Sequence, residues 1–434
     1  MTGAGKVRAR MGRKALMWPA AVVLAAGTGA LWPVGTAAAA TSPTHARGTL
    51  RVATTGSDRG NCRSSPCKTL GHALTQASRN DTIVIYPGIY RESDNANVVK
   101  PRLTGLRIRS VGSGARTVID ATGNANGILI QASGVSVTGL TVRNANLEGI
   151  LAEPPLSSWP KTAGSPPANI SHVTIAGNVV VHNDRVYNTS LPPTSACPRS
   201  LTDADDCGEG IHLLGVSWSK VIGNNVSRNV GGILVSDGGF GISVGPAAHN
   251  LIAFNHSFDN AFDCGITLPG HDPRAVATTG PNAGRPRPNL AGAYDNLVVR
   301  NVSNHNGAAG LLDATPYPGA GSYDNTFVGN WASGNGNAGF VLHSHAPLQD
   351  VSGIVVAGNR FGQNNLAGDP DTGVTTTTGV MLLSVAVPTS IVVADNKISH
   401  NVNGVAFTSN ITVVGHNRFV NMTHRYLLYT PPAS

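Results

Sequence analysis

Charged and aromatic residues are scarce in this sequence. Asp, Glu, Lys and Arg together make up 12% of its 434 residues, and Phe, Trp and Tyr make up 5%. Glycine and asparagine are abundant instead, which is typical of a turn-rich β-solenoid and not of an α/β enzyme. The formal charge of +8 arises mostly in residues 1–40, which carry five cations and no anion, so the remainder has 8 − 5 = +3. So small an excess of positive charge gives no reason to expect nucleic-acid binding.

Long apolar runs are missing beyond the first residues. Five Lys and Arg residues precede an apolar run from Ala15 to Leu31, and small residues follow as far as Ala40. This order is typical of a cleaved secretory signal peptide. We therefore predict a signal peptide at 1–40, a linker at 41–49 and a secreted mature protein. No membrane partner is expected after cleavage, because no later segment has the apolar length to span a bilayer.

Cysteines number only five. In an exported chain this count predicts two local disulfides and one remainder. The natural pairs are Cys62 with Cys67 and Cys197 with Cys207. We expect Cys264 to be free and buried, as a small apolar side chain within the fold.

A nine-fold recurrence of asparagine runs along the chain. Its members are Asn144, Asn178, Asn224, Asn255, Asn301, Asn330, Asn359, Asn396 and Asn417. In eight of the nine units an apolar residue stands three positions earlier, and in seven a second asparagine follows five positions later. A glycine and an apolar alternation come next, as in Gly210-Ile-His-Leu and Gly265-Ile-Thr-Leu. Two short strands joined by a polar turn, repeated in this way, indicate a solenoid.

The repeats are too short to hold a crossover helix, so equivalent strands should stack in parallel from coil to coil. The predicted fold is all-β, a parallel β-helix formed by residues 50–434, in which the asparagines stack as ladders. The strand-entry glycines are expected to serve sharp backbone turns. A cap at about 50–90 should include a short amphipathic helix within 67–77, which covers the open end of the core. Residues 81–120 are expected to form the first coils and 426–429 the last strand.

The amphipathic segment, the run Asp81-Thr-Ile-Val-Ile-Tyr-Pro-Gly-Ile-Tyr and the Asn/Gly coils resemble the secreted right-handed parallel β-helix repeat family. That family shares its fold with pectate lyases, and the resemblance covers nearly all of the mature chain. It implies a right-handed β-helix that acts on or binds glycans, as polysaccharide lyases, glycoside hydrolases, uronate epimerases and non-catalytic glycan-binding solenoids do. Neither the Asn-Thr-Asp of polygalacturonases nor the Asp-Pro-His-Glu of alginate epimerases is present. No functional residue is therefore carried over from those families.

Candidate site residues come from counting outward positions in each coil from its strand-entry glycine. We predict that acids and imidazoles from successive coils form one line along an outer wall. The predicted catalytic residues are Asp263, His271, Asp237, His212 and Asp313. The predicted substrate-binding residues are Glu209, Asp272, Arg274, His343 and His345, with Arg285 and Arg287 as further cations for acidic sugars. Insertions at 153–169, 188–207, 269–293 and 314–322 lie beside this strand and should wall a groove.

The chemistry follows from the spacing of these groups. Carboxylates one coil apart repel each other, so they need a shared proton, an interleaved histidine or a cation. A protonated carboxyl beside an ionised one suits glycoside hydrolysis, and a histidine beside a uronate suits proton abstraction for elimination or epimerisation. No metal ligand set is predicted. No cofactor is established by the sequence, and calcium is a candidate because Asp203, Asp205, Asp206 and Glu209 offer oxygen atoms that suit it.

The leading hypothesis is thus a secreted enzyme that cuts or epimerises a polysaccharide, one that contains uronate in the favoured case. The alternative is a non-catalytic extracellular solenoid that binds glycan or has a structural role. A metal-handling accessory protein is disfavoured by the lack of a Cys/His/Met cluster.

Overall fold

The computed structural model describes residues 48–92, 97–112, 114–162, 164–183, 208–239 and 242–432. These residues belong to one compact unit, Arg47–Ser434. The predicted signal peptide, most of the linker, the predicted Cys197–Cys207 bridge and the calcium candidates Asp203, Asp205 and Asp206 lie outside the described residues. None of the helices in the described ranges is long and apolar enough to cross a bilayer.

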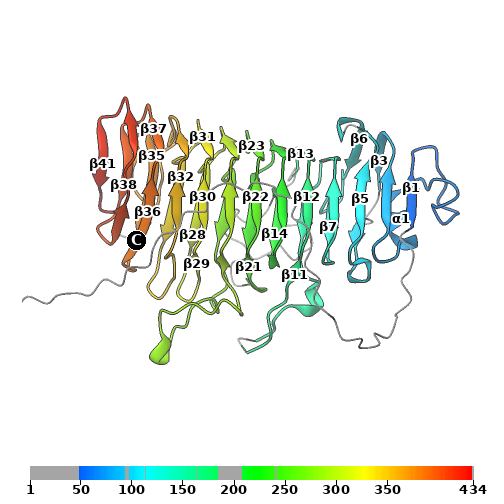
Figure 1. The fold of residues 1–434 in the computed structure, drawn as a ribbon, viewed down its shortest axis with the longest axis horizontal. Helices are drawn as coiled ribbons and strands as arrows, with labels where there is room; N and C mark the ends of the chain where they lie inside the picture. The colour runs from blue at the N-terminus through cyan, green and yellow to red at the C-terminus, as the bar shows by residue number, and fades with distance from the viewer. Residues whose placement is uncertain are drawn as a thin grey trace, which may run out of the picture. The chain divides into compact units, whose positions relative to one another are not determined.

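Three long parallel sheets make up the described unit (Figure 1). The first sheet contains β1 (Thr49–Val52), β2 (Thr82–Ile85), β5 (Arg107–Ser110), β8 (Ser136–Thr138), β12 (Thr174–Ala176), β16 (Lys220–Ile222), β22 (Leu251–Ala253), β26 (Leu297–Val299), β30 (Thr326–Val328), β33 (Val355–Ala357), β36 (Thr389–Ala394) and β39 (Ile411–Val414). The second sheet contains β3 (Gly88–Arg91), β6 (Thr117–Asp120), β9 (Thr141–Arg143), β13 (Val179–Val181), β17 (Asn225–Ser227), β23 (His256–Phe258), β27 (Val302–Asn304), β31 (Trp331–Ser333), β34 (Arg360–Phe361), β37 (Lys397–Ser399) and β40 (Arg418–Val420).

The third sheet carries most of the residues of functional interest. It contains β4 (Val98–Val99), β7 (Ile128–Ile130), β10 (Ile150–Ala152), β14 (Glu209–Leu214), β18 (Gly231–Ser236), β24 (Ile266–Pro269), β28 (Leu311–Thr315), β32 (Phe340–Ser344), β35 (Thr378–Ser384), β38 (Asn403–Phe407) and β41 (His424–Leu428). Shorter pieces are the pair β11 (Ile170–Ser171) and β15 (Val216–Ser217), the hairpin β19 (Gly238–Gly239) and β20 (Ile242–Ser243), and the set β21 (Ala247–Ala248), β25 (Ala293–Tyr294) and β29 (Ser322–Tyr323). The short 3₁₀ segments are η1 (Pro101–Leu103), η2 (Gly114–Arg116), η3 (Leu156–Ser158) and η5 (Gly280–Asn282).

The chain passes from the first sheet to the second and the third and then begins the next coil. The strand order repeats in this way from β2, β3 and β4 to β39, β40 and β41. Every pairing within the three sheets is parallel, and the described residues contain a single α-helix. The fold is therefore the predicted right-handed parallel β-helix, and both the all-β class and the resemblance in architecture are confirmed.

The core is a set of apolar columns that run through the coils. One column on the first sheet passes through Ile175, Val221, Ile252, Val298, Phe327, Val356 and Val393, all of them fully buried. Equivalent positions one coil apart lie about 4.8 Å from each other. Burying each such side chain contributes about 1.5 to 3 kcal/mol relative to leaving it exposed, so the apolar alternation in the repeats is sufficient to drive coil stacking.

Asparagine ladders run along the corners between sheets, as predicted. In the first ladder, from Asn178 to Asn417, each Nδ2 donates to Oδ1 of the asparagine in the next coil at 2.9–3.0 Å. The second ladder runs from Asn183 to Asn401. A third, which was not predicted, joins Asn250, Asn296 and Asn325. Because most of these amides are buried, their hydrogen bonds offset the desolvation of polar atoms in each coil that the ladders cross.

Asn144 does not belong to the ladder in which the sequence repeat placed it. It follows β9 with a φ of 64°, and its Nδ2 donates to Asp120 Oδ1 at 3.0 Å. The first-ladder position in that coil is Leu140, whose backbone N–H donates to Asn178 Oδ1 at 3.0 Å. Residues that directly precede the ladder asparagines, such as Phe254 with a φ of 56°, adopt the left-handed backbone conformation. Asparagine also suits that conformation, so asparagine spacing alone does not distinguish this position from the ladder position.

The strand-entry glycines, which were predicted to serve sharp turns, leave room for close packing of the backbone and do not have a positive φ. At Gly149, which does not have a positive φ, an added Cβ would lie 2.4 Å from Val180 Cγ1 and 2.5 Å from the carbonyl oxygen of Gly210. The chain turns inward here against the second-ladder corner. Any larger residue would overlap the core of the next coil.

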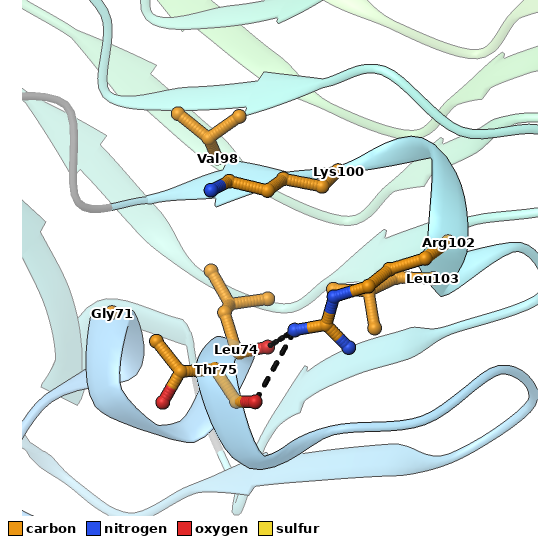
Figure 2. A pocket seen from close by; sticks show the side chains of 7 residues that line it. All are labelled: Gly71, Leu74, Thr75, Val98, Lys100, Arg102 and Leu103. Atoms are coloured by element: carbon orange, nitrogen blue, oxygen red, sulfur yellow. Dashed lines mark hydrogen bonds between the residues drawn. The ribbon is translucent and has the colours of Figure 1, made fainter.

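A short helix, α1 (Leu70–Gln76), caps the N-terminal end of the core and confirms the predicted plug. Its Leu70 and Leu74 join the main core cluster, and the Thr69 side chain accepts a hydrogen bond from His72 N as an N-cap. Arg102 donates to the carbonyl oxygens of Leu74 (2.9 Å) and Thr75 (3.2 Å) at the other end of the helix (Figure 2). A cation there complements the helix dipole, and a cavity of about 490 Å³ lies between α1 and the segment Val98–Leu103.

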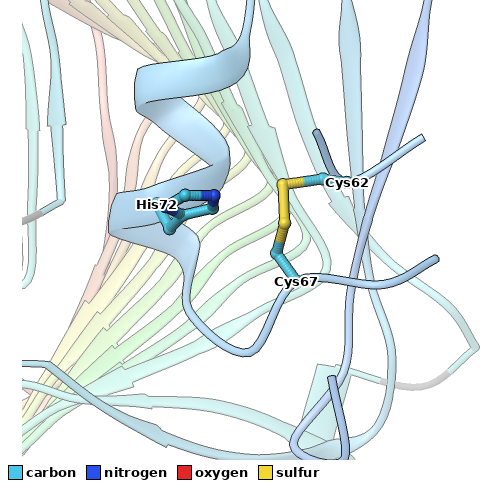
Figure 3. Close-up of side chains that lie close together, drawn as sticks. All are labelled: Cys62, Cys67 and His72. Carbon is cyan, nitrogen blue, oxygen red and sulfur yellow. A yellow bond between two sulfur atoms is a disulfide. The ribbon is translucent and has the colours of Figure 1, made fainter. Parts of the chain in front are cut away.

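The cysteines of the described residues behave as predicted. Cys62 and Cys67 form a disulfide beside α1, with His72 close by (Figure 3). Cys264 is free and buried, and burial together with the neighbouring Asp263 raises the pKa of its thiol. The disulfide closes the loop that leads into the cap helix, whereas Cys264 fills an outer position of the third sheet.

Candidate functional site

The outer face of the third sheet carries the predicted site strand, and its insertions lie where the sequence suggested. β10, β24 and β28 each lead into a long segment before the next short strand, at 153–169, 270–292 and 316–321. The insertion at 188–207 lies outside the described residues. Several insertions end in the short strands β11, β25 and β29, so they are anchored to the scaffold at both ends.

The outer face does not carry one continuous polar line. The outward position of His212 is aligned with Leu151 in one neighbouring coil and Leu234 in the other. The same position continues as Thr267, Leu312, Val341 and Met381. The predicted residues therefore separate into three groups and one isolated core residue, and the prediction of a single line is wrong.

The first group centres on His212 of β14. Its Nε2 lies 2.9 Å from Ser236 Oγ of β18, and its Nδ1 lies 3.2 Å from Glu148 Oε1, in the turn before β10. A serine, an imidazole and a carboxylate from three successive coils thus form one hydrogen-bonded chain. In the arrangement that satisfies all three, Nδ1–H donates to Glu148 and Nε2 accepts the Ser236 hydroxyl proton, a tautomer assigned from these partners.

Glu209 and Asp263 complete this group from one side. Ligand atoms of Glu148, Glu209 and His212 all lie within 4.8 Å of one another. Gly231 separates Glu209 from Asp263, and an added Cβ there would lie 3.2 Å from Asp263 Oδ2 and 3.3 Å from Glu209 Cγ. The two acidic side chains therefore approach the same side-chain-free position.

Burial makes this group electrostatically unusual. Glu148 is fully buried, Glu209 is 1% exposed, His212 2% and Asp263 9%. Among the described residues, Oε2 of Glu148 has no hydrogen-bond partner. An unpaired buried carboxylate oxygen is strongly disfavoured without a proton, a cation or a bound polar group, so the group is poised to take one of these.

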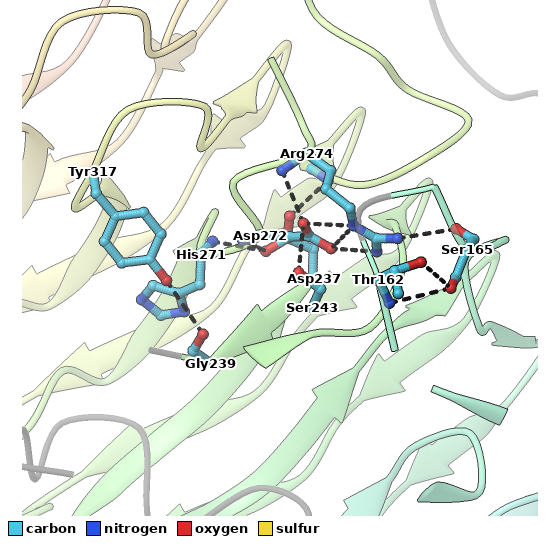
Figure 4. Close-up of polar contacts among 10 residues, drawn as sticks. Thr162, Ser165, Asp237, Gly239, Ser243, His271, Asp272, Arg274 and Tyr317 are labelled. Carbon is cyan, nitrogen blue, oxygen red and sulfur yellow. Dashed lines mark hydrogen bonds and ion pairs between the residues drawn. The ribbon is translucent and has the colours of Figure 1, made fainter. Parts of the chain in front are cut away.

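The second group, Asp237, His271, Asp272 and Arg274, holds the base of the 270–292 insertion (Figure 4). Asp237 Oδ1 accepts from the backbone N–H of His271 (2.7 Å) and Asp272 (3.2 Å), and Oδ2 accepts from Gly292 N (2.7 Å). Burial and the adjacent Asp272 carboxylate raise the pKa of Asp237 to about 8, against the effect of these donors. The carboxylate thereby ties both ends of the insertion together.

Arg274 is occupied by its own loop. Its Nη2 lies 2.6 Å from Asp272 Oδ2 and its Nε 2.9 Å from Asp272 Oδ1, and its side chain is 6% exposed. His271 Nδ1 lies 3.4 Å from the Gly238 carbonyl oxygen, and Tyr317 Oη donates to Gly239 O at 3.3 Å. These contacts fix the loop, and Arg285 and Arg287 are the exposed cations of the same insertion.

Asp313 points into the core, and its predicted outward position is wrong. It is aligned with Leu268 and Leu342, both of which belong to the main core cluster. Asn325 Nδ2 donates to its Oδ2 at 3.0 Å, and its Oδ1 has no hydrogen-bond partner among the described residues. Burial raises its pKa to about 8. The third position of a third-sheet strand, counted from the entry glycine, faces inward, and Asp313 occupies that position.

His343 and His345 form the third group with two carboxylates that follow in sequence. His343 Nε2 lies 3.2 Å from Asp369 Oδ2, and Asp371 Oδ2 lies 3.4 Å from His343 Nδ1 and 3.8 Å from His345 Nε2. β32 is four strands from β14 in the sheet order, about 19 Å at the usual strand spacing. The two groups are therefore separate sites.

Glu148 and Ser236 were not among the predicted catalytic residues. Glu148 precedes Gly149 as Glu209 precedes Gly210, so the same counting would have placed the two acids side by side. Asp369 and Asp371 do not stand at a fixed distance from a strand-entry glycine, so the same counting could not have found them. They lie in an irregular segment after β34, and only the fold brings that segment against β32.

Comparison with known proteins adds little beyond the architecture. No protein-family model matches the sequence, and no curated protein matches it. The solved A-module of mannuronan C-5 epimerase AlgE4 from Azotobacter vinelandii has a TM-score of 0.49 and 15% identity, over 81% of this chain and 90% of that one. The AlgE6 A-module of the same organism gives 0.48 and 16%, over 83% and 90%. Pectate lyase Pel9A gives 0.42 and 13%, over 72% and 80%. Likeness at this level carries no argument about function.

Proposed function

We propose that this chain is a secreted enzyme that acts on a polysaccharide, with its catalytic centre on the outer face of the third sheet at β14, β18 and β24. The single observation that carries the proposal is the hydrogen-bonded chain Glu148–His212–Ser236 beside Glu209 and Asp263. Two carboxyl groups beside one imidazole, with a third carboxyl on the other side of Gly231, are the components of proton transfer at a sugar ring.

His212 is the proposed base. Glu148 holds Nδ1 at 3.2 Å, which orients the ring and leaves Nε2 as the basic nitrogen. In a uronate chain, the Ser236 hydroxyl, which donates to Nε2 at 2.9 Å, would pass its proton to Nε2 as its oxygen takes the proton from the carbon next to the sugar carboxylate. The electron pair left on that carbon either expels the linked sugar, giving an unsaturated uronate, or accepts a proton on the opposite face, giving the epimer. Geometry of this kind contributes about 100- to 10,000-fold to the rate.

Glu209 and Asp263 are the proposed proton donors. Both side chains lie against the buried Gly231, where an added Cβ would be 3.2 Å from Asp263 Oδ2 and 3.3 Å from Glu209 Cγ, so the two acids flank one position of the sheet. Ligand atoms of Glu148 and Glu209 lie within 4.8 Å of each other, which leaves no space for the water of an inverting glycosidase, where carboxyls stand about 6.5 to 9.5 Å apart. The arrangement therefore favours elimination or epimerisation over inverting hydrolysis.

Phe262 gives the centre an exposed aromatic edge. It is 77% exposed and directly precedes Asp263, whose backbone N–H donates to the Val230 carbonyl oxygen at 3.0 Å. An exposed aromatic side chain next in sequence to Asp263 offers a flat apolar surface for a sugar ring.

The extracellular setting is part of the proposal. The sequence begins with a segment typical of a secretory signal peptide, and the Cys62–Cys67 disulfide suits an oxidising compartment.

The test is an activity survey with matched variants. Pectate, alginate, glycosaminoglycans and neutral glycans are incubated with the chain, while reducing ends, the ultraviolet absorbance of unsaturated uronates and the proton NMR signals of epimers are followed. We expect absorbance or new epimer signals on a uronate polymer, and their loss in His212→Gln. His256→Gln, on the second sheet, is the control and should retain full activity.

Thermal unfolding of each variant separates lost chemistry from lost folding. A folded His212→Gln with unchanged turnover would remove His212 from the mechanism. New reducing ends without unsaturated products would show hydrolysis and contradict the preference for elimination or epimerisation.

A second candidate function is glycan binding without catalysis. It is favoured by the burial of Glu148, Glu209 and His212. None of these side chains is more than 2% exposed, so a glycan on the surface would have little contact with the groups that transfer protons. Retardation in affinity gels that contain glycan, together with silence in every activity assay, would establish this alternative.

A further inference from the structure

We propose that His343, His345 and Asp371 form a binding site for a divalent transition-metal ion, with Asp369 as a positioning residue. The sequence predicted His343 and His345 as substrate-binding residues and predicted no metal ligand set. The fold adds Asp371 to these two histidines, from the segment after β34. The ligand atoms of the three residues lie within 4.8 Å of one another.

β32 presents both imidazoles on one side. Positions 343 and 345 are two residues apart on or directly after this strand, so their side chains face the same way. Their ring centroids are 5.1 Å apart. Asp371 Oδ2 lies 3.4 Å from His343 Nδ1 and 3.8 Å from His345 Nε2. Ligand atoms around one tetrahedral zinc ion stand roughly 3.3 Å apart, as follows from bonds of about 2.0 Å, so small side-chain rotations complete the site.

The segment that carries Asp371 is held in place before any ion binds. Asp369 Oδ1 accepts from the backbone N–H of Asp371 at 3.0 Å and of Thr372 at 3.4 Å. Asn365 Nδ2 donates to the carbonyl oxygens of Val374 and Thr376, each at 2.8 Å. A rigid turn of this kind fixes the direction of the Asp371 carboxylate toward β32.

Asp369 provides the outer partner that metal-binding histidines usually have. Its Oδ2 lies 3.2 Å from His343 Nε2, so a proton on that nitrogen leaves Nδ1 free to bind the ion. A carboxylate that holds the distal nitrogen of a ligating imidazole sets its tautomer and orientation. An ion pair between His343 and a carboxylate would not need a second imidazole, that of His345, near Asp371.

Charge and donor type indicate the class of ion. Two carboxylates with two neutral imidazoles carry a charge of −2, which one divalent cation balances. Two nitrogens and one oxygen suit zinc, nickel or copper and not calcium. The His345 side chain is 33% exposed and that of Asp371 51%, so the ion would keep positions open to solvent.

Two other groups of His, Cys and Glu residues lie close enough to hold a metal ion among the described residues, and both are weaker candidates. Cys62 and Cys67 are joined in a disulfide beside His72. Glu148, Glu209 and His212 belong to the site already described.

The test uses the untagged chain and Zn²⁺ alone, by isothermal titration calorimetry. We expect a binding event that His345→Ala and Asp371→Asn each abolish. His172→Asn, at an exposed position with a φ of 60° that asparagine tolerates, is the control and should bind as the parent does. Asp369→Asn should weaken binding by about 10- to 100-fold without abolishing it.

Cobalt provides a second readout that a merely structural role would not affect. Co²⁺ bound by the parent should give a visible absorption spectrum that is lost in His345→Ala. Unfolding midpoints measured without metal check that each variant is folded. The proposal is overturned if the parent binds no Zn²⁺, or if the titration of folded His345→Ala and Asp371→Asn matches that of the parent.

Discussion

Asp313 offers a direct measure of how the β-helix core tolerates a carboxyl group. It is fully buried between the levels of Leu268 and Leu342, and its Oδ1 has no hydrogen-bond partner among the described residues. Burial raises its pKa from 3.8 to about 8 in the folded chain. The unfolded chain releases this proton near pH 4, whereas the folded chain keeps it until about pH 8.

Between these values the folded state binds one more proton than the unfolded state does. The free energy of unfolding should therefore fall as pH rises, by about 1.4 kcal/mol for each pH unit. From pH 5 to pH 8 the loss attributable to Asp313 is about 4 kcal/mol. Replacing Asp313 by asparagine removes the ionisable group and should remove this slope.

The assay is urea unfolding at several pH values between 5 and 8, for the parent and Asp313→Asn in the same buffers. Asp237, whose pKa is also raised to about 8, adds a slope of the same sign to both proteins, so the difference between them isolates Asp313. The asparagine side chain in the variant would leave an amide group without a partner, which costs about 1 to 3 kcal/mol. That cost does not depend on pH, so the readout is the slope and not the stability itself.

Asp313→Leu is the second variant, since leucine occupies the same position in the coils on both sides. It should abolish the slope as asparagine does and should be the most stable of the three proteins at pH 8. Equal pH slopes in the parent and both variants would refute the assignment of a raised pKa to this carboxyl.

Three further substitutions test the scaffold and the proposed site. Asn301→Ala removes a ladder amide that bonds Ile252 O at 2.9 Å and Asn330 Oδ1 at 3.0 Å; it should lower the free energy of unfolding by about 2 to 4 kcal/mol, whereas Asn289→Ala in an exposed loop should not change it. Gly149→Ala drives a methyl group into the core of the next coil and should cost about 1 to 3 kcal/mol, while Gly164→Ala, with nothing within 4 Å of the added Cβ, should be neutral by the same denaturation assay. Phe262→Ala, at a residue 77% exposed, should weaken retention by the polysaccharide in affinity gels without lowering the unfolding midpoint; unaltered retention would remove Phe262 from the site.

Local pattern was enough to determine the scaffold. The period-2 alternation, the asparagine spacing and the strand-entry glycines are properties of short segments, and each coil buries its apolar side against its neighbours only. The ladder from Asn178 to Asn417, the cap at Leu70–Gln76 and the Cys62–Cys67 bridge were therefore predictable. Asn144 was misplaced because two different corners of the coil favour asparagine.

The facing of single side chains and the contacts between distant segments were decided by the tertiary structure. Asp313 directly follows Leu312, which faces outward. Because successive side chains of a strand point to opposite faces, Asp313 points into the core. His212 meets Glu148 across 64 residues because coil stacking makes them neighbours. Asp371 reaches His345 because an irregular segment folds back over the third sheet, and no spacing in the chain encodes that return. The local sequence of each repeat specifies one coil, whereas the chemistry depends on which coils and loops are brought together when the coils stack.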